Sequence, residues 1–598
     1  MSESTSTVCP VPPPSRPIPN PPGRVLNGST VVAANGEPTP HADPKAAAST
    51  RARWVWWTLG GITVAAVVLR FFNLANGGLW YDELIMARLT AGSWDALWTE
   101  IGLGRPPVYP VAGKLWADVF GHSDIALRSL SALLGVASVP VLFFIARRLF
   151  DGRVALLAAG LLAVSPYQIY YSQEHRYYAL FLLLCLTSIL LLLRVLGVGD
   201  STTAGRQPRS RWLWVGYVLI SALAFYTHTF TLFLLSSIGI AVLAMYKSRA
   251  LSPGRMRQFL ISQVAIMGLI LPWGLLKLGV WQRVTTGTAA DSSALVAPWI
   301  SSPPWWAPVR TVGNFLFLGV KYLSEPWVIA ALVVLVAGLG WGLVRGGGPR
   351  RWAGTLTQAV KEAWTPRRGA WWIAAAWAVG PLLMVLVLSY TVRPIYNDRY
   401  LMASTAGLYL LVAAGVVALA RVVPMWATVG VLLLGMTGSL TTYYQQPDKG
   451  AWAEAAAWLD DRLAGDEALA FSSERGIGRE NANVRANWFW YAQRGGDQEN
   501  VKINVRNDFT TVVGDLKRLA DAHNGVWLVL WRDPDESIGL KDKFPAGVVE
   551  GLELSESKVF FDLTLLRFES RGQEIEVSAG RSTAGPTAET PNNGENRS

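Results

Sequence analysis

Residues 78–84 read Gly78-Leu79-Trp80-Tyr81-Asp82-Glu83-Leu84 and directly follow the first long apolar segment of the chain, Trp54 to Phe72. Two adjacent carboxylates therefore lie where a membrane span has just ended. An aromatic pair leads into them, as is typical of a membrane–water interface. We interpret Asp82 and Glu83 as the chemical centre of a polytopic membrane enzyme. Two solvated or helix-capping acids remain the alternative, because carboxylates also favour helix N-termini.

The composition indicates an integral membrane protein with many spans. The chain has 598 residues, 51% hydrophobic and 16% charged, and a mean hydropathy of +0.28. Soluble domains carry about 25% charged residues, and many apolar runs here reach the roughly 20 residues that a helix needs to cross a bilayer. The formal charge of +11 does not indicate nucleic-acid binding, because Lys and Arg cluster in loops between spans. The two cysteines offer neither a disulfide framework nor a metal cluster.

The predicted topology has about eleven spans. Arg51 and Arg53 precede the first span, so the N-terminus is expected in the cytoplasm. Two long loops, 73–123 and 279–325, then face the outside, and the last span leads outward again. The spans are expected at approximately 54–72, 125–146, 153–169, 177–195, 212–228, 230–246, 258–278, 326–344, 370–389, 401–420 and 424–441.

The chain is predicted to contain a helical membrane domain and a small external α/β domain. The membrane domain covers 54–441, and the α/β domain covers 445–569, where the composition becomes like that of a soluble protein. Residues 1–50 and 570–598 are rich in small and polar residues and are expected to be disordered tails. Within 445–569, helices are expected at Ala451–Ala464 and Thr510–Ala522, and strands at Ala468–Ser472, Gly525–Trp531 and Val559–Phe568.

Candidate catalytic acids lie on the predicted external side, opposite the basic loops. A carboxylate there suits general base work on a sugar hydroxyl. Because like charges disfavour joint ionisation, one of the pair Asp82 and Glu83 is expected to have a perturbed pKa. Glu174 and Arg176 lie at the external mouth of the third and fourth spans. Glu174 is expected to complete an acidic pocket and Arg176 to face a lipid phosphate, with a local ion pair as the alternative.

Cations on the same side predict phosphate recognition. Arg393 and Arg399 flank the start of the tenth span, and Arg105 lies in the first loop. Arginine suits bidentate binding of phosphate, although snorkelling to headgroups is the simpler alternative. His228 is expected either to pack structurally, to hydrogen-bond a phosphate or to bind a metal with Glu174. No cofactor is expected, and a divalent metal is not indicated but stays an open alternative.

Acids together with phosphate-binding cations at an outer membrane interface imply a lipid-phosphate substrate. The natural chemistry is displacement of a phosphate leaving group attached to the lipid. The arginines would stabilise the charge that develops on that leaving group.

Five motifs, in this order, resemble the GT-C membrane glycosyltransferases. The most similar group is the superfamily of protein mannosyltransferases and lipid A aminoarabinose transferases, and the resemblance covers roughly residues 54–441. The chain departs from many relatives in having Arg105 where they have His, so a role of that His is not carried over. The motifs are Trp80-Tyr81-Asp82-Glu83, Arg105-Pro106-Pro107-Val108-Tyr109, Tyr171-Ser172-Gln173-Glu174-His175-Arg176-Tyr177, Tyr226-Thr227-His228 and Asp398-Arg399-Tyr400.

The resemblance implies inverting transfer of one sugar from a polyprenyl-phosphate donor to an envelope glycan, glycolipid or protein acceptor, on the external face of the cytoplasmic membrane. Mannose and arabinose are plausible sugars. It implies Asp82, with Glu83 as second candidate, as general base, and Arg399 at the lipid phosphate. Glu174 would complete the catalytic set. The further substrate-binding candidates are Arg105, Tyr109, Arg176, Tyr177, His228, Arg393 and Tyr400.

Two other classes of function remain open. A lipid-linked sugar transporter or flippase without catalysis would need charges along the transmembrane path, whereas the predicted spans are nearly free of acidic residues. A scaffold whose external domain binds envelope polymer would not depend on Asp82 or Arg399. In each case the bilayer is a partner and nucleic acid is not.

Overall fold

The computed structural model describes most of the chain outside its two ends. The chain divides into two compact parts, Met1–Trp54 and Val55–Ser598, and the contacts described below lie within the second part. The predicted disordered tails lie outside the described residues, except that the first helix begins at Pro44 and the last strand ends at Ser570. The described residues are 44–75, 77–199, 211–285, 300–319, 325–345, 354, 357–358, 368–445, 450–473, 478–493, 500–502, 509–531 and 551–570.

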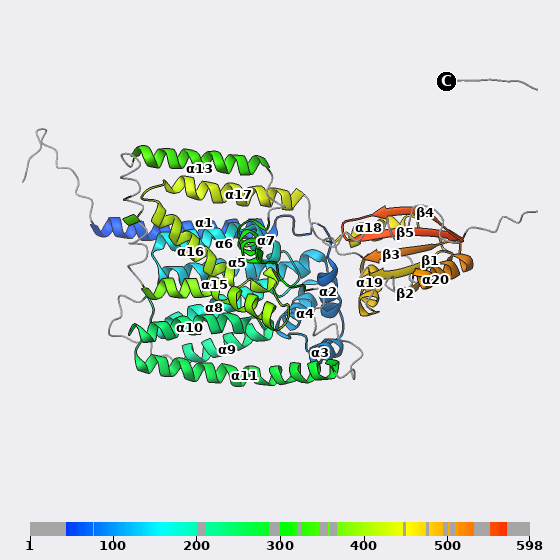
Figure 1. The fold of residues 1–598 in the computed structure, drawn as a ribbon, viewed down its shortest axis with the longest axis horizontal. Helices are drawn as coiled ribbons and strands as arrows, with labels where there is room; N and C mark the ends of the chain where they lie inside the picture. The colour runs from blue at the N-terminus through cyan, green and yellow to red at the C-terminus, as the bar shows by residue number, and fades with distance from the viewer. Residues whose placement is uncertain are drawn as a thin grey trace, which may run out of the picture. The chain divides into compact units, whose positions relative to one another are not determined.

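The described part of the membrane region is helical throughout (Figure 1). Its elements are α1 (Pro44–Phe71), α2 (Tyr81–Ala91), α3 (Trp94–Gly102), α4 (Val108–Phe120), α5 (Asp124–Leu149), α6 (Gly152–Val164), α7 (Pro166–Ser172), α8 (Tyr178–Leu196), α9 (Arg211–Thr227), α10 (Thr231–Lys247), α11 (Pro253–Thr285), α12 (Ala307–Phe317), α13 (Glu325–Arg345), α15 (Arg368–Thr391), the 3-10 turn η2 (Asp398–Leu401), α16 (Ser404–Leu419) and α17 (Met425–Gln445).

The predicted polytopic helical fold is confirmed, while the number of spans stays a prediction. Within the described residues, six helices are long and apolar enough to cross a bilayer, or seven if the bent pair α6 and α7 is one span. Three shorter apolar helices, Thr231–Lys247, Pro326–Trp341 and Ser404–Leu419, match further predicted spans. The apolar segments of these six helices are Arg53–Phe71, Asp124–Leu149, Tyr178–Leu196, Pro253–Gly279, Ala370–Thr391 and Met425–Gln445.

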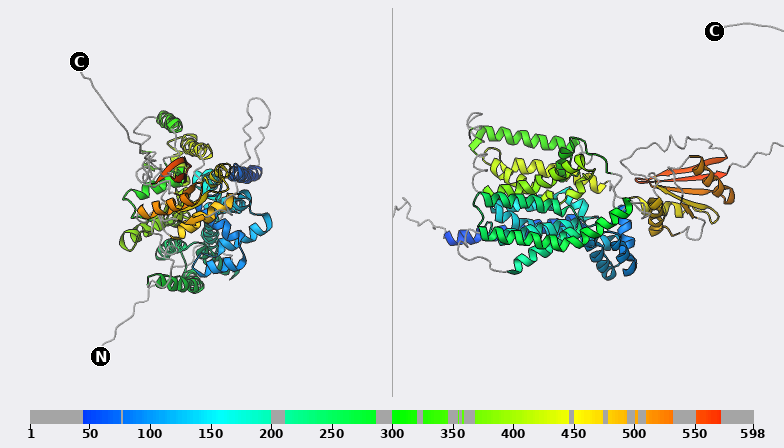
Figure 2. Two further views of the ribbon diagram at one scale, coloured as in Figure 1. Left: turned by 90° about the vertical axis from the view of Figure 1, so that its right-hand side faces the viewer. Right: turned by 60° about the horizontal axis from the view of Figure 1, so that its bottom comes forward.

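The helices of this bundle run side by side (Figure 2). Helix α5 packs against α6 and α8, and α9 packs against α8 and α11. Helix α16 packs against α6 and α15, which in turn contacts α10, while α13 packs along α17. Outside this bundle, the short helix α2 packs on α4.

The third predicted span is broken at Ser165 and Pro166. Helices α6 and α7 meet there at 54°. Proline disfavours the helical conformation in the residue before it, and Ser165 is accordingly extended and caps α7 by accepting from the backbone N–H of Gln168 at 3.3 Å. The buried Arg70 of α1 donates to the carbonyls of Leu162 (3.0 Å) and Ala163 (2.9 Å) at the end of α6. The last carbonyls of a helix have no hydrogen-bond partner within it, and Arg70 supplies one here. Helix α7 then directs the following loop away from the axis of α6.

The C-terminal region forms the expected small α/β unit. Its sheet has the order β2-β1-β3-β5-β4, in which β2, β1 and β3 are parallel and β5 is antiparallel to β3 and β4. In register, Ala470 lies opposite Leu528, and Leu528 lies opposite Leu566. The elements are α18 (Trp452–Asp460), β1 (Ala468–Ser473), α19 (Gly478–Tyr491), β2 (Asn500–Lys502), α20 (Phe509–Ala522), β3 (Val526–Trp531), β4 (Leu552–Val559) and β5 (Leu563–Ser570).

Both faces of this sheet are covered, which explains why β3 is an unbroken apolar run. Successive side chains of a strand point to opposite faces. One face, with Trp527 and Val529, packs against α18 and α19 and continues into Leu79 and Leu84 of the first loop. The other face, with Leu528, packs against α20.

Several predicted elements are corrected by the structure. Within the predicted external loop 73–123, the stretch from Asp82 to Trp98 lies in two helices, α2 and α3, with Ser93 as N-cap of the second. The strand expected at Val559–Phe568 begins only at Leu563, as β5, and pairs with the preceding antiparallel strand β4, which ends at Val559. Helix α19 was not expected, because much of its sequence is polar, and strand β2 was not expected, because it has only three residues.

Close approach of α15 and α16 depends on Gly407. A Cβ there would lie 2.6 Å from the backbone N of Ala378. We expect Gly407→Ala to separate the two helices and to lower stability by about 1–3 kcal/mol, measured by thermal unfolding in detergent. Gly415→Ala on the same helix meets nothing within 4 Å and is the matched control. Equal stability of the two variants would contradict this packing.

Candidate functional site

The two adjacent acids point in different directions because they lie on the first turn of a helix. Helix α2 begins at Tyr81, with Trp80 as its N-cap residue. Successive residues of an α-helix are rotated by about 100°. Asp82 and Glu83 therefore have separate surroundings, and the structure gives them different partners.

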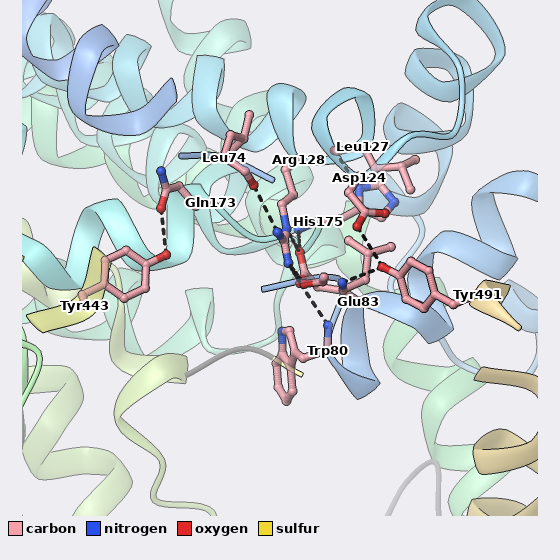
Figure 3. A network of polar contacts seen from close by, with 12 residues as sticks. Leu74, Trp80, Glu83, Asp124, Leu127, Arg128, Gln173, His175, Tyr443 and Tyr491 are labelled. Carbon is pink, nitrogen blue, oxygen red and sulfur yellow. Dashed lines mark hydrogen bonds and ion pairs between the residues drawn. The ribbon is translucent and has the colours of Figure 1, made fainter. Parts of the chain in front are cut away.

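Glu83 lies in a fully buried ion pair with Arg128 of α5. Arg128 Nη2 lies 2.6 Å from Glu83 Oε2 and its Nε lies 2.9 Å from Oε1, with both side chains 0% exposed. The backbone N–H groups of His175 (2.6 Å) and Trp80 (3.3 Å) also donate to this carboxylate. Figure 3 shows Glu83 among these groups. Glu83 thus caps α2 and joins it to α5 and to the α7–α8 loop.

Asp82 instead contacts two arginines from distant parts of the chain. Its Oδ2 lies 3.3 Å from Nη2 of Arg176 and 3.6 Å from Nη1 of Arg399. Arg176 also donates to the backbone carbonyl of Asp82 at 3.2 Å. About a quarter of the Asp82 side chain, 24%, is exposed. The structure therefore brings together three of the residues predicted from the motifs.

Both arginines are held among aromatic rings. Arg176 lies over Tyr177 at 5.2 Å, and Arg399 lies over Trp80 at 5.9 Å and Tyr400 at 5.6 Å. The buried Nε atoms of both guanidinium groups have no hydrogen-bond partner among the described residues. Burial lowers the pKa of Arg176, but the charge of Asp82 together with Tyr178 and Tyr177 more than offsets burial, so its net pKa is raised and it stays protonated. The pair retains donors suited to an anion.

Arg399 is placed by its own short turn. Its backbone N–H donates to the side chain of Asn397 at 3.2 Å, at the start of η2. The neighbouring Asp398 accepts a hydrogen bond from Asn314 and lies 3.8 Å from Arg310, both on α12. The predicted second external loop therefore supports the arginine through α12.

His228 packs in an aromatic cluster beside these arginines. Its ring lies 5.1 Å from that of Tyr177 and 5.0 Å from that of Tyr400. Burial lowers its pKa to about 3, so the imidazole is neutral. Its Nδ1 accepts from the backbone N–H of Phe230 at 3.2 Å, which leaves Nε2 as the N–H donor.

His175 is fully buried and joins three helices. Its Nδ1 donates to the carbonyl of Leu127 at 3.0 Å and lies 3.2 Å from the hydroxyl of Tyr109, while Nε2 lies 3.2 Å from the hydroxyl of Thr90. Burial lowers its pKa to about 4. Tyr109, predicted to bind substrate, is itself buried, with its hydroxyl 2.8 Å from that of Ser131.

The remaining predicted residues lie in three different settings. Glu174 is fully buried in the loop between α7 and α8. Arg105 pairs with Glu100 at 3.1 Å, both partly exposed, just before α4. Arg393 is exposed between α15 and η2. Their assignments stay predictions.

Arg128, His175 and Tyr491 are the site residues that sequence reasoning missed. Arg128 had a signal, because a charged residue inside an apolar span must find a partner. His175 was part of a quoted motif but received no role. Tyr491 lies in α19, more than 300 residues away, and has no local signal. Within the described residues, no group of three His, Cys, Asp or Glu side chains could hold a metal.

Comparison with known proteins finds a family model and a curated relative that match part of the chain. Residues 104–274 match the family model of dolichyl-phosphate-mannose-protein mannosyltransferases. This confirms the predicted resemblance. A curated relative, undecaprenyl phosphate-alpha-4-amino-4-deoxy-L-arabinose arabinosyl transferase 2 of Pseudomonas fluorescens, is 27% identical over an alignment of 306 residues, and the match covers 46% of this chain. The chain spans half (50%) of the length of this relative.

Two solved structures are similar in outline. The crystal structure of ArnT from Cupriavidus metallidurans bound to undecaprenyl phosphate has 15% identity and a TM-score of 0.46, covering 85% of this chain and 97% of that one. The archaeal oligosaccharyltransferase AglB from Archaeoglobus fulgidus, in complex with an inhibitory peptide and a dolichol-phosphate, has 14% identity and a TM-score of 0.40, covering 80% and 70%.

Removing Arg128 should destabilise the protein strongly. Arg128→Met leaves the carboxylate of Glu83 buried without its cation, which costs about 3–5 kcal/mol. Arg153→Met, at an exposed position, should change stability by less than about 0.5 kcal/mol. Unfolding in denaturant would measure both, and a small effect at Arg128 would contradict a structural ion pair.

His175 should make the fold sensitive to acid. Its pKa is about 4 in the folded protein, against 6.5 as the ordinary value. Between these values the unfolded chain binds a proton that the folded chain excludes, so stability falls as pH drops from 6.5 to 4, by roughly 3 kcal/mol in all. His175→Gln removes this titration, so its unfolding free energy should depend less on pH in this range. Equal slopes for both proteins would refute the assignment.

Proposed function

We propose that the protein is a glycosyltransferase that moves one sugar from a polyprenyl-phosphate donor to a cell-envelope acceptor. The observation that carries this proposal is the contact of Asp82 with Arg176 and Arg399. One carboxylate and two guanidinium groups from three distant segments form a base beside an anion site. The family match, and the lipid phosphate in the name of the arabinosyl transferase relative, support the same chemistry.

In the proposed reaction, a hydroxyl oxygen of the acceptor attacks the anomeric carbon of the donor sugar. Asp82 takes the hydroxyl proton as general base. The bond between the anomeric carbon and the phosphate oxygen breaks, and its electron pair leaves with the lipid phosphate. Arg176 and Arg399 stabilise this leaving group, and the configuration at the anomeric carbon is inverted.

Glu83 fits a positioning role better than the role of base. Its two oxygens accept from Arg128 and from two backbone N–H groups inside the protein. A base must reach the proton that it removes, and a fully buried carboxylate has no access to an acceptor. Neutral His228 is a candidate donor to the phosphate through Nε2.

The basic loops of the chain support an orientation with the N-terminus in the cytoplasm and the C-terminal unit outside. The donor would then enter from the bilayer and the acceptor from the external side of the cytoplasmic membrane. Mannose and arabinose remain the proposed sugars, and a glycan, glycolipid or protein the proposed acceptors.

Asp82→Asn should abolish transfer. Loss of a general base lowers the rate by about 10²–10⁴-fold, while binding of the lipid donor should persist because both arginines remain. The measurement is envelope sugar composition in a deletion strain that carries wild type, Asp82→Asn or Asp95→Asn at equal expression. Asp95 is exposed on α3 and serves as the matched control.

Wild type and Asp95→Asn should restore a sugar that Asp82→Asn does not restore, and that sugar identifies the product. Restoration by all three proteins would overturn the assignment of Asp82 and favour transport or scaffolding. Product formation by purified wild type from a polyprenyl-phosphate sugar separates an enzyme from a transporter, because a transporter forms none.

A further inference from the structure

The turn that carries Asp82 is held by the C-terminal α/β unit as well as by the membrane helices. Tyr81, the residue before Asp82, stacks on Trp531 at the end of β3, with ring centroids 4.3 Å apart and an interplanar angle of 19°. The segment that enters the unit also lies against this turn. A Cβ at Gly450 would come within 2.8 Å of the Cα of Trp80.

Helix α19 contributes three polar residues to the same turn. Asn483, Asn487 and Tyr491 are spaced four residues apart and so share one face of the helix. Asn483 donates to the hydroxyl of Tyr81 at 3.3 Å and accepts from Arg88 at 3.0 Å. The fully buried Asn487 makes a long contact, 3.5 Å, with the backbone carbonyl of Tyr81.

Tyr491 makes the most constrained of these contacts. Its hydroxyl accepts from the backbone N–H of Leu79 at 2.7 Å and donates to Asp124 Oδ2 at 2.8 Å (Figure 3). An N–H can only donate and a carboxylate accepts, so the proton of the hydroxyl is directed to Asp124. Burial raises the pKa of Tyr491, so the hydroxyl keeps this proton. It joins the segment before Asp82 to the start of α5, the helix that carries Arg128.

We propose that Tyr491, supported by Asn483 and Asn487, is a positioning residue that sets the first turn of α2 and thereby the direction of Asp82 toward the reacting hydroxyl. This inference rests on the proposed role of Asp82 as general base. The arginines Arg176 and Arg399 come from other segments, and the hydrogen bonds of α19 described above fall on the turn of α2 and on α5, not on these guanidinium groups. Loss of the hydrogen bonds of Tyr491 therefore acts on the proton-transfer step and leaves donor binding in place.

The test is steady-state transfer by the full-length protein in detergent, at a temperature where every variant is folded. Tyr491→Phe deletes both hydrogen bonds and should lower kcat by tenfold or more, with KM for the lipid donor and Kd for polyprenyl phosphate within twofold of wild type. Asn483→Ala, at a half-buried position, should lower kcat in the same pattern and gives a second variant if Tyr491→Phe does not fold.

Two controls separate positioning from general destabilisation. Leu516→Ala removes packing between α20 and the far face of the same sheet, so it weakens the unit without touching α2 and should keep kcat. Tyr246→Phe removes an exposed hydroxyl on α10 and should behave as wild type.

The inference is overturned if Tyr491→Phe, or Asn483→Ala in its place, keeps wild-type kcat. It is also overturned if Leu516→Ala lowers kcat as much as Tyr491→Phe does. Failure of the proposed function itself looks different, because Asp82→Asn would then transfer as well as wild type.

Discussion

The buried ion pair between Glu83 and Arg128 is the constraint on which the site depends. Burying two charges is costly unless every hydrogen-bonding position is filled, and here the surroundings meet that demand. Glu83 accepts from the backbone of His175, whose neighbour Arg176 is thereby brought to Asp82. Arg128 also donates to the carbonyls of Leu74 (3.1 Å) and Gly78. One pair thus fixes the segment that follows α1, the start of α2 and the loop before α8.

The charges at Asp82 match a phosphodiester. Arg176 and Arg399 supply two positive charges and Asp82 one negative charge, and His228 is neutral because burial lowers its pKa. The group therefore carries a net charge of +1, which a lipid phosphodiester of charge −1 would balance. In the proposed reaction, a base beside such a site would lie next to the bond that breaks, so one arrangement would serve both donor binding and proton transfer.

The sequence was sufficient to predict the helical fold and the C-terminal α/β unit. It also singled out Asp82, Arg176 and Arg399, which the structure brings together, because each lies in a short motif beside an apolar run. It was not sufficient to predict that Asp82 and Glu83 have different surroundings. Which acid points inward depends on where α2 begins, and a shift of one residue turns both by about 100°. That start is fixed by contacts with Tyr491 and Trp531, which are distant in sequence and follow no periodic pattern.

The topology of the C-terminal sheet explains why its contact falls on this turn. In open sheets with parallel strands, ligands bind beyond the carboxyl ends of the strands, where loops diverge. Trp531 is the last residue of β3, and its partner across that end is Tyr81 of the chain itself. The edge at which open parallel sheets commonly bind ligands therefore lies against the turn that bears Asp82. A fold that commonly recognises small molecules is used here to order a segment of the membrane domain.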